Sequence, residues 1–359
     1  MRLPLTDPED FAKVDMAQVE KMVDTFLEHG FTYFDTAYMY HEFQSEKIVR
    51  AALVERHDRS AFTLATKLPT MFLKAEGDQE RIFAEQLEKC GVDYFDYYLL
   101  HNLNVANYRK VCRFDSFAFA ARMKAEGKIR HVGFSFHDSA ELLDEILTAH
   151  PETEFVQLQI NYMDWENESI QSRRCYETAR RHGKPVVVME PVKGGTLARL
   201  PEEAEQRFRA VRPELSPASW AIRYAAGLDG VMMVLSGMSS MEQLRDNISY
   251  MQHFEPLNAE ERAAVEDAVG IINRSIAVPC TACRYCVDGC PKQIAIPEYF
   301  ALYNNAEQSL NKGFSVQTVY YANLAQTHGR ASDCIGCRKC EKSCPQHLPI
   351  VEHLRQVAA

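Results

Sequence analysis

HVGFSFHDSAELLDEILTAHPETEFVQLQI, residues 131–160, contains the pattern that decides the fold. Two apolar runs rich in strand-forming residues, His131–Ser135 and Phe155–Ile160, flank an amphipathic stretch at Ser139–Ala149. An amphipathic period between two short apolar runs predicts a strand, a helix and a second strand. Strands joined by a crossover helix lie parallel and are covered by helices, so this segment predicts one βαβ unit of an α/β protein.

The same alternation extends over the first 270 residues. Further strands are expected at Phe31–Asp35, Phe62–Thr66, Tyr94–Leu100, Pro185–Met189 and Gly230–Leu235, and further helices at Met16–His29, Ser45–Arg56, Gln79–Cys90, Ser169–His182 and Ser216–Ala226. No GxGxxG motif follows the first strand, which removes the main support for a Rossmann fold. Seven strand–helix units over about 270 residues instead predict a (β/α)8 TIM barrel, whose typical length is about 250 residues.

One unit of that barrel is missing from the sequence. The helix at Met16–His29 should follow the first strand, yet no segment before it has the pattern of a buried strand. Either the polypeptide begins upstream of Met1 or another segment closes the barrel. We expect the former, with roughly 25–30 residues supplying a hairpin and the strand. An unpaired barrel edge should leave the 359-residue chain weakly stable.

Composition limits the class of protein. The 359 residues carry a net charge of −10, with 46% apolar and 25% charged residues, which are ordinary values for a globular chain. No run of about 18 apolar residues occurs, and the N-terminus lacks a secretory signal. The acidic balance disfavours nucleic-acid binding. These features predict a soluble, cytoplasmic protein without membrane or nucleic-acid partners.

Eight of the eleven cysteines fall in the last 80 residues, in two copies of the pattern CxxCxxCxxxCP. The first copy is Cys280, Cys283, Cys286 and Cys290, and the second is Cys334, Cys337, Cys340 and Cys344. Three closely spaced thiolates hold one iron–sulfur cluster, while the cysteine before proline ligates the other cluster. The spacing therefore predicts two [4Fe–4S] clusters with crossed ligation, Cys344 completing the first and Cys290 the second. Zinc and disulfides are the less favoured alternatives.

The 43 residues between Cys290 and Cys334 carry apolar residues at helical intervals. This long insert predicts a mainly helical dicluster ferredoxin-like domain rather than a compact β-ribbon. We therefore expect two domains, a barrel at residues 1–270 and a cluster domain at residues 271–359.

Polar residues lie at three consecutive strand ends, where TIM barrels place their chemistry. Asp35 and Tyr40 follow the first strand in FDTAYMY, Lys67 closes the next, and His101 follows the third. A lysine among apolar strands needs a counter-charge, which Asp35 can supply. The ammonium should lower the pKa of the Tyr40 phenol and make it a usable proton donor near neutral pH.

At these residues the sequence resembles the aldo/keto reductase family. The family's Asp–Tyr–Lys–His tetrad resembles the residues in FDTAYMY, in the TK at the next strand end and in the LLH at the strand end after that. The resemblance continues, in order, through GKIRHVGFS, FVQLQINYMD, VVVMEPVKGG and SGMSSMEQLRDN. The cysteine-rich tail resembles the family's iron–sulfur branch. The resemblance implies an oxidoreductase in which Tyr40 is the general acid, Lys67 tunes its pKa and Asp35 partners Lys67. His101 would orient the carbonyl of a small-molecule substrate while NAD(P)H delivers hydride.

The resemblance also implies cofactor contacts. Ser135 and Gln157 match the residues that bind the carboxamide of the nicotinamide, and Asn161 lies at the same strand end. Met189 stands where the family has an aromatic residue that stacks on the nicotinamide ring. The loop of Lys193, Gly194 and Gly195 would bind the pyrophosphate, and Asp246 and Asn247 match positions that bind adenine. Glycines let backbone N–H groups approach phosphate oxygens, although an ordinary turn is the alternative for that loop. Gly237 and Gln243 stand where the family has cations for a 2′-phosphate, which favours NADH slightly over NADPH. Ser239, Ser240 and Arg245 could compensate.

The two predicted halves carry different electron chemistry, since hydride transfer moves two electrons and a [4Fe–4S] cluster passes one. No flavin motif is visible to connect them. The favoured hypothesis is a carbonyl reductase whose clusters serve structure or oxygen sensing. The alternatives are an electron-transfer protein that docks a redox partner, with the barrel as scaffold, and a reductase with an unrecognised linking cofactor.

Overall fold

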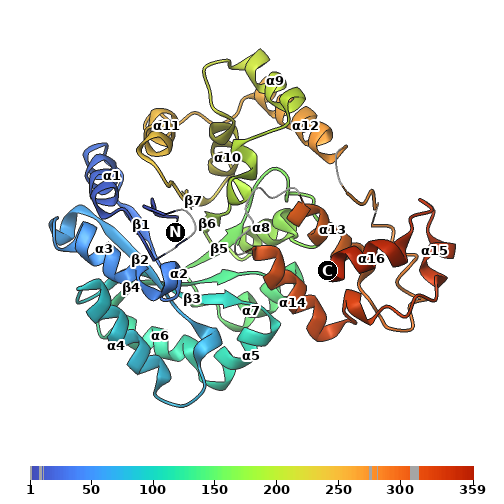
Figure 1. Ribbon diagram of the computed structural model, residues 1–359. Helices are drawn as coiled ribbons and strands as arrows, with labels where there is room; N and C mark the ends of the chain where they lie inside the picture. The colour runs from blue at the N-terminus through green and yellow to red at the C-terminus, as the bar shows by residue number, and fades with distance from the viewer. Residues whose placement is uncertain (1, 8–9, 11, 275–276, 281, 308–314) are drawn as a thin grey trace.

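The computed structural model describes residues 2–7, 10, 12–274, 277–280, 282–307 and 315–359. Seven parallel strands form one curled sheet in sequence order (Figure 1). They are β1 (Tyr33–Asp35), β2 (Thr63–Leu68), β3 (Phe95–Leu103), β4 (Ile129–Phe136), β5 (Phe155–Gln159), β6 (Val186–Met189) and β7 (Val231–Val234). This barrel-like arrangement confirms the predicted α/β class and the seven expected strand–helix units.

Helices cover the outside of the sheet (Figure 1). They are α1 (Met16–Glu28), α3 (Ser45–Val49), α4 (Asp78–Cys90), α5 (Val105–Arg113), α6 (Ser116–Ala125), α7 (Ala140–Ala149), α8 (Ser172–Arg181) and α10 (Pro217–Ala226). Farther from the sheet, α11 (Met241–Met251) packs against α1 and α10, and α9 (Glu202–Val211) and α12 (Ala259–Asn273) form a separate apolar cluster with α10. α7 shows why they form where they do. The Ser139 side chain caps its N-terminus by accepting from the Leu142 N–H, and Leu143, Ile146 and Leu147 bury one face.

Most residues of β2, β3, β5 and β6 are buried, whereas the edge strand β7 is only partly buried. Burial on both faces explains the continuous apolar runs of the inner strands. Every residue of β5 is buried. One cluster of buried side chains comes from the strands alone and includes Leu99, Phe155 and Val187, so it fills the inside of the curled sheet. Strand residues such as Phe134 and Leu158 belong instead to a larger cluster shared with the surrounding helices.

The sheet ends at β1 on one side and β7 on the other, and within the described residues these two strands are not paired. In the described part of the chain, no strand precedes α1. The N-terminal residues lie between the two edge strands (Figure 1). The Leu3 N–H donates to Nε2 of His41, just beyond β1, and the Arg2 side chain packs against Gly237, just beyond β7.

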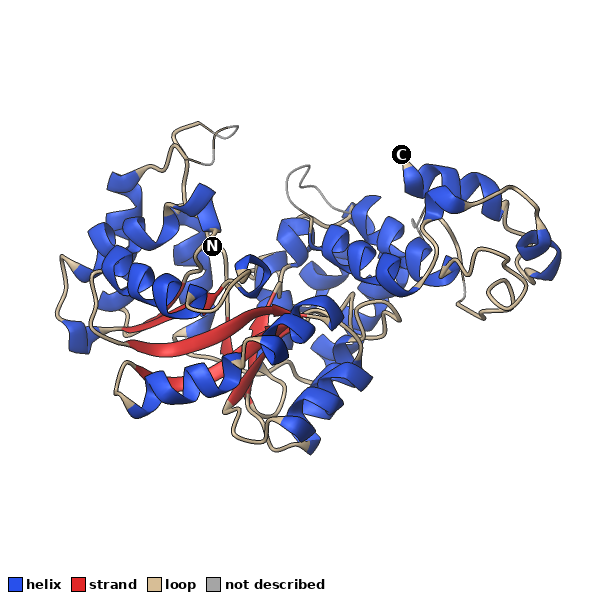
Figure 2. Ribbon diagram, turned by 90° about the horizontal axis from the view of Figure 1, so that it is seen from below, coloured by secondary structure: helices blue, strands red, loops and turns tan. Residues whose placement is uncertain are grey.

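The C-terminal region is helical, as the sequence predicted. It contains α13 (Ile296–Glu307), α14 (Val316–Thr327), α15 (Lys339–Ser343) and α16 (Ile350–Ala358). These helices share a small core with the cysteine loops, including Ile294, Tyr299, Phe300 and Leu354. Figure 2 shows this helical module beside the sheet rather than wrapped around it. In the described residues, no helix is both long and apolar enough to cross a membrane.

The helical module packs against loops at the carboxyl ends of the strands. Ile170 of the loop after β5 forms an apolar cluster with Leu302 and Tyr320. The Ser169 hydroxyl donates to the Glu298 carbonyl over 3.0 Å, and the Asn323 amide donates to the carbonyl of His137 over 2.9 Å. The module therefore lies next to the edge of the sheet where a TIM barrel carries its active site.

Candidate functional site

The four polar residues predicted from consecutive strand ends lie together. Asp35 ends β1, Lys67 lies near the end of β2, and His101 lies near the end of β3. Tyr40 begins the short helix α2 (Tyr40–Phe43) directly after β1. Because parallel neighbours end at the same edge of the sheet, these side chains converge although as many as 66 residues separate them in the chain.

Lys67 is fully buried and paired. Its Nζ lies 2.6 Å from Oδ1 of Asp35 and donates to the Thr36 carbonyl over 2.7 Å. The same Nζ lies 5.0 Å from the ring centroid of Tyr40. Burial lowers the pKa of Lys67, but Asp35 and Tyr40 raise it, and the net pKa lies above its ordinary value. Lys67 is therefore a buried cation at neutral pH, beside the phenol.

The Tyr40 phenol differs from the sequence-based expectation. Burial raises its pKa, and the Lys67 charge offsets that effect only in part, so the net pKa lies above the ordinary value rather than below it. The reason is that removing water from a phenolate costs more here than the ammonium returns. Tyr40 is consequently protonated at neutral pH, the state that a proton donor requires.

His101 completes the group as a neutral imidazole. Its side chain is buried, and its ring meets the Tyr40 ring edge-on at a centroid distance of 6.0 Å. Burial, and then the Lys67 charge, lower the pKa of His101 well below its ordinary value. Within the described residues its Nδ1 has no hydrogen-bond partner. A neutral ring with one free nitrogen can orient a polar group of a substrate.

The backbone beside Tyr40 is strained. His41, Glu42 and Phe43 have φ values of 48°, 51° and 67°, in the left-handed region that L-residues rarely adopt. Such strain persists only where the surrounding structure holds it, and it concentrates at functional sites. The Leu3 N–H bond to His41 is one of the contacts that hold this turn.

Sequence reasoning missed a buried carboxyl behind Lys67. Glu46 has no exposed surface, and its Oε1 accepts bonds of 2.7 Å from the Thr66 hydroxyl and the Gln86 amide. The same Gln86 amide donates to the Lys67 carbonyl over 3.0 Å, so this network supports the lysine's backbone. Burial raises the pKa of Glu46 above its ordinary value. Nothing in the SE dipeptide marked this burial, since charged residues are mostly exposed.

The predicted carboxamide contacts occupy neighbouring strands. Ser135 and Gln157 are register partners of β4 and β5, and the Gln157 amide lies 3.4 Å from the Met189 sulfur at the end of β6. The Ser135 hydroxyl accepts the Asn102 N–H over 2.8 Å. Oε1 of Gln157 is buried and has no partner within the described residues. This orphaned acceptor fits the amide of a nicotinamide ring, because a buried acceptor without a donor is costly.

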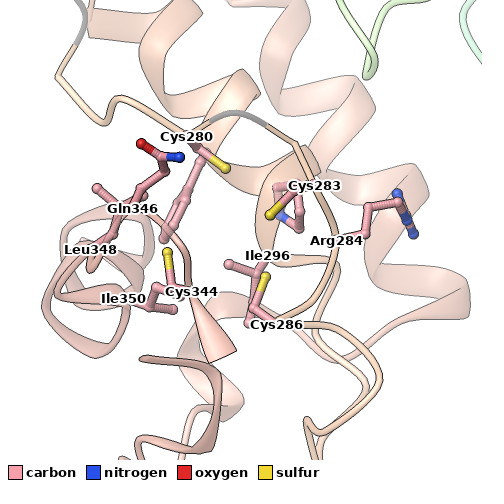
Figure 3. A pocket seen from close by; sticks show the side chains of 11 residues that line it. Cys280, Cys283, Arg284, Cys286, Ile296, Cys344, Gln346, Leu348 and Ile350 are labelled. Atoms are coloured by element: carbon pink, nitrogen blue, oxygen red, sulfur yellow. The ribbon is translucent and has the colours of Figure 1, made fainter. Parts of the chain in front are cut away.

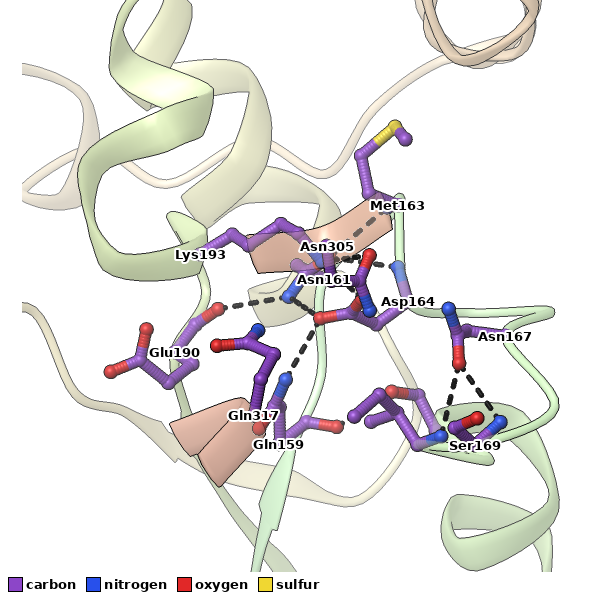
Figure 4. Close-up of polar contacts among 12 residues, drawn as sticks. Gln159, Asn161, Met163, Asp164, Asn167, Ser169, Glu190, Lys193, Asn305 and Gln317 are labelled. Atoms are coloured by element: carbon purple, nitrogen blue, oxygen red, sulfur yellow. Dashed lines mark hydrogen bonds and ion pairs between the residues drawn. The ribbon is translucent and has the colours of Figure 1, made fainter. Parts of the chain in front are cut away.

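Asn161 is committed to the turn after β5 (Figure 4). Its Nδ2 donates to Oδ2 of Asp164 over 2.7 Å and to the Glu190 carbonyl over 3.1 Å. Its Oδ1 accepts the N–H groups of Met163 and Asp164, and the side chain has no exposed surface. All four hydrogen-bonding positions are used. The Asn161 side chain therefore has no free hydrogen-bonding group for the expected contact with a cofactor.

The predicted pyrophosphate loop forms a left-handed turn. Lys193, Gly194 and Gly195 have φ values of 48°, 66° and 101°. The Lys193 ammonium is buried in contact with Asp164 and Asn305, so it does not face solvent. Gly195 is exposed and presents its backbone at the surface. The Gly195 N–H donates to the Val192 carbonyl over 3.0 Å, so the Gly194 N–H, rather than the Lys193 ammonium, is the donor that this turn offers to a phosphate.

The predicted adenosine positions gather at the start of α11 and are partly engaged. Oε1 of Gln243 accepts the Ser239 N–H over 2.7 Å, Oδ2 of Asp246 accepts the Ser216 hydroxyl over 2.6 Å, and the Asn247 amide donates to the Ser236 hydroxyl over 2.6 Å. A side chain at Gly237 would meet the Arg2 side chain about 3.1 Å away. Neither Gly237 nor Gln243 carries a charge, and the cation beside this region is Arg2, whose guanidinium also lies near Gly194.

The eight clustered cysteines line two hollows in the helical module, four in each. Cys280, Cys283, Cys286 and Cys344 line the first (Figure 3), and Cys290, Cys334, Cys337 and Cys340 line the second. This is the grouping that crossed ligation requires. Four cysteines per hollow is the donor set of a [4Fe–4S] cluster. Among the described residues, no three His, Cys, Asp or Glu side chains converge on a single ion position.

The walls of the hollows are mainly apolar. Ile296, Phe300 and Ile350 border the first, while Arg284 brings a cation to its rim. Burial raises the pKa of the Cys286 thiol to about 12, so a metal must displace this proton when it binds. An apolar wall limits water access to a cluster, which is one way a protein sets its potential.

Two family profiles match the chain. The aldo/keto reductase family matches residues 5–269, and the 4Fe-4S dicluster domain matches residues 279–348. The first match covers most of the chain and contains the Lys67 site. The second contains all eight cysteines of the two hollows.

Curated proteins and solved structures are similar to the chain. An aldo-keto reductase of Mycolicibacterium vanbaalenii is 28% identical over 252 residues, which span 70% of this chain and 83% of that protein. L-galactose dehydrogenase of Arabidopsis thaliana is 23% identical, over 66% and 79%. The solved aldo-keto reductase AKR11C1 from Bacillus halodurans, holo form, superposes with a TM-score of 0.56 at 24% identity, over 71% and 88% of the chains. An aldo/keto reductase from Klebsiella pneumoniae in complex with NADP and acetate gives 0.56 at 20% identity, over 70% and 85%.

Proposed function

Because the chain belongs to the aldo/keto reductase family, we propose that it reduces an aldehyde or ketone with NAD(P)H, by hydride transfer. The observation that carries this proposal is the buried Lys67–Asp35 pair beside Tyr40 and His101. A cation, a protonated phenol and a neutral imidazole lie together at the carboxyl end of the sheet. They provide the proton donor, its stabilising charge and the substrate-orienting group that carbonyl reduction requires of a protein. The 4Fe-4S dicluster domain is the second part of this oxidoreductase.

Each side chain has a distinct task. The His101 ring orients the carbonyl oxygen of the substrate toward the Tyr40 hydroxyl. When bound, reduced nicotinamide supplies hydride to the carbonyl carbon. Tyr40 gives its proton to the oxygen, so the product is an alcohol, and Lys67 stabilises the phenolate that remains. Asp35 keeps Lys67 charged and in position.

The residues present fit a nicotinamide cofactor. We propose that the free Oε1 of Gln157 and the Ser135 hydroxyl receive its carboxamide, with Met189 beside the ring. The Gly194 N–H would meet the diphosphate, since the Gly195 N–H already donates to the Val192 carbonyl. Gly237 and Gln243 offer no charge to a 2′-phosphate, so the proposal includes a modest preference for NADH.

We propose that the two cysteine hollows each hold a [4Fe–4S] cluster with crossed ligation. Such a cluster exchanges one electron at a time, whereas the barrel site moves a hydride. The clusters therefore serve the fold of the helical module or the sensing of oxygen in this proposal, rather than the chemical step.

The test compares two neighbouring tyrosines in anaerobically purified protein. Tyr40→Phe should reduce NAD(P)H oxidation with a panel of aldehydes and ketones by roughly 10²–10⁴-fold, the usual contribution of a general acid. Nucleotide affinity should be nearly unchanged. Tyr38→Phe is the matched control, since the Tyr38 hydroxyl donates to Glu85, away from Lys67. Full turnover of Tyr40→Phe on every carbonyl reduced by the wild type would refute the proposal.

A second candidate function rests on the surface of the cluster motifs. Tyr285 and Ile335, which lie between cluster cysteines, are 64% and 61% exposed, and Cys283 and Cys337 are exposed as well. Exposed apolar side chains beside redox centres favour docking of an electron-transfer partner. Electron exchange with a ferredoxin or flavodoxin in the absence of nicotinamide, lost in Tyr285→Glu, would support this function.

A further inference from the structure

We propose that the cluster-bearing module completes the dinucleotide site by holding the Lys193–Gly195 turn in place through Asn305. This inference rests on the proposed nicotinamide function and adds to it a positioning role for a residue outside the barrel. It gives the helical module a direct part in nucleotide binding, independent of electron transfer.

The contact joins two parts of the chain that are 112 residues apart. Oδ1 of Asn305, on α13, accepts from the Lys193 ammonium over 2.9 Å, and the same ammonium contacts Asp164 (Figure 4). The three side chains are 5%, 5% and 0% exposed, in that order. Nδ2 of Asn305 has no partner among the described residues, so the bond to Lys193 is what orients this amide. A buried ammonium needs all its donors satisfied, and Asn305 provides part of that.

The same lysine lies in a strained backbone. Lys193 has a φ of 48°, and Gly194 and Gly195 continue in the left-handed region. Glycine adopts that region freely, whereas lysine does so only when other contacts hold it. Anchoring of the Lys193 side chain at both Asp164 and Asn305 supplies this restraint. The exposed backbone of the turn, where a diphosphate would bind, is therefore shaped by a contact from the helical module.

α13 connects this anchor to the first cysteine hollow. Ile296, Pro297 and Phe300, in its first turns, line that hollow, and Asn305 lies near its other end. At 1.5 Å per residue, Ile296 and Asn305 are about 13 Å apart along the helix axis. The packing of α13 against the first cysteine hollow therefore sets the position of Asn305, and Asn305 in turn holds the Lys193–Gly195 turn.

The experiment measures nucleotide affinity directly. NADH and NADPH dissociation constants are determined by calorimetry on anaerobically purified full-length protein, with iron counted in every sample. Asn305→Leu should weaken binding by about 5- to 20-fold, within the range of typical coupling between sites. Asn305→Asp, which keeps an oxygen acceptor for Lys193, should retain affinity close to that of the wild type.

The matched control removes a different contact of the same helix. The Ser169 hydroxyl bonds the Glu298 carbonyl of α13 but lies outside the turn. Ser169→Ala should leave both dissociation constants within about twofold of the wild type, well below the roughly 5- to 20-fold change expected for Asn305→Leu. A control that weakens binding as much as Asn305→Leu would show that general loosening of the module is responsible, which overturns a specific role for Asn305.

The outcomes separate this inference from the proposed function. If the wild type binds neither nucleotide, the proposed function fails. If the wild type binds and Asn305→Leu binds equally well, the positioning role is wrong. If Asn305→Leu loses its iron, Lys193→Met, which leaves α13 unchanged, replaces it; unaltered affinity in that variant also overturns the inference.

Discussion

The ammonium nitrogen of Lys67 lies 2.6 Å from Oδ1 of Asp35, and the lysine side chain has no exposed surface. In this setting neither charge is well hydrated, so each depends on the other. Because the charges of Lys67 and Asp35 both act on the pKa of the Tyr40 phenol, the pair links the stability of the barrel to the chemistry at its edge. The first two predictions concern this pair.

Lys67→Met should lower the rate of carbonyl reduction by roughly 10²–10⁴-fold, because the phenolate left by Tyr40 loses its neighbouring cation. Nucleotide affinity should change little. Lys89→Met is the control, since Lys89 lies over Tyr38 and pairs with Glu85 at a distance from the site. Steady-state kinetics and calorimetry check both variants; wild-type turnover in Lys67→Met would contradict the assignment.

Asp35→Asn should reduce the free energy of unfolding by about 3–5 kcal/mol, the usual cost of leaving one buried charge without its partner. The pKa of Lys67 is raised in the folded state above its ordinary 10.5, so the stability contributed by the pair is present below pH 10.5 and is lost as pH rises through the folded value. The wild type should lose this contribution only in strong alkali. Urea unfolding of both proteins at pH 7, 9 and 10 tests this, and equal stabilities throughout would exclude the pair as a stabilising element.

Protonation of His137 should destabilise the contact between barrel and helical module in mild acid. Burial lowers the pKa of His137 to about 4, and its ring packs edge-on against Tyr320 of α14. A group with a lowered folded pKa contributes stability above its unfolded value, here 6.5, that is lost as pH falls toward 4. His137→Phe should therefore flatten the decline in unfolding free energy between pH 7 and 5. Parallel slopes for variant and wild type would argue against this.

Two double substitutions should distinguish crossed from uncrossed cluster ligation. Wild-type protein is expected to hold about eight iron and eight sulfide. Cys280→Ser with Cys344→Ser removes two cysteines of the first hollow, so about four iron should remain. Cys280→Ser with Cys290→Ser affects both hollows and should leave almost none. The reverse result would establish uncrossed ligation, and one zinc per chain would exclude the clusters.

Local pattern was enough to predict much of the barrel. The apolar runs at Phe155–Ile160 and Pro185–Met189 became β5 and β6, because strands buried on both faces leave a continuous apolar signature. Parallel strands also end at one edge, so Asp35, Lys67 and His101 could be expected to meet from their positions alone. The cysteine spacing predicted the two hollows for a similar reason, since it repeats a ligand geometry in the primary structure.

Properties that depend on many neighbours at once could not be predicted in this way. The sign of the pKa shift at Tyr40 is a difference between burial and the charge of Lys67, and only the packed structure sets the size of each. Glu46 and Gln86 lie 40 residues apart, and their bond behind Lys67 has no local signature. Asn161 matched a cofactor position, but the turn after β5 uses all of its hydrogen-bonding groups.

By itself, the sequence determined the order of strands and helices, the residues at each strand end and the two sets of four cysteines, because short-range periodicity and ligand spacing are local properties. Only the tertiary structure decided that Lys193 turns its ammonium away from solvent toward Asp164 and Asn305. That choice depends on where α13 packs against the barrel. A buried charge is stabilised by whichever groups the fold brings to it. Lys193 and Asn305 are 112 residues apart in the chain, so no local sequence pattern predicts their contact.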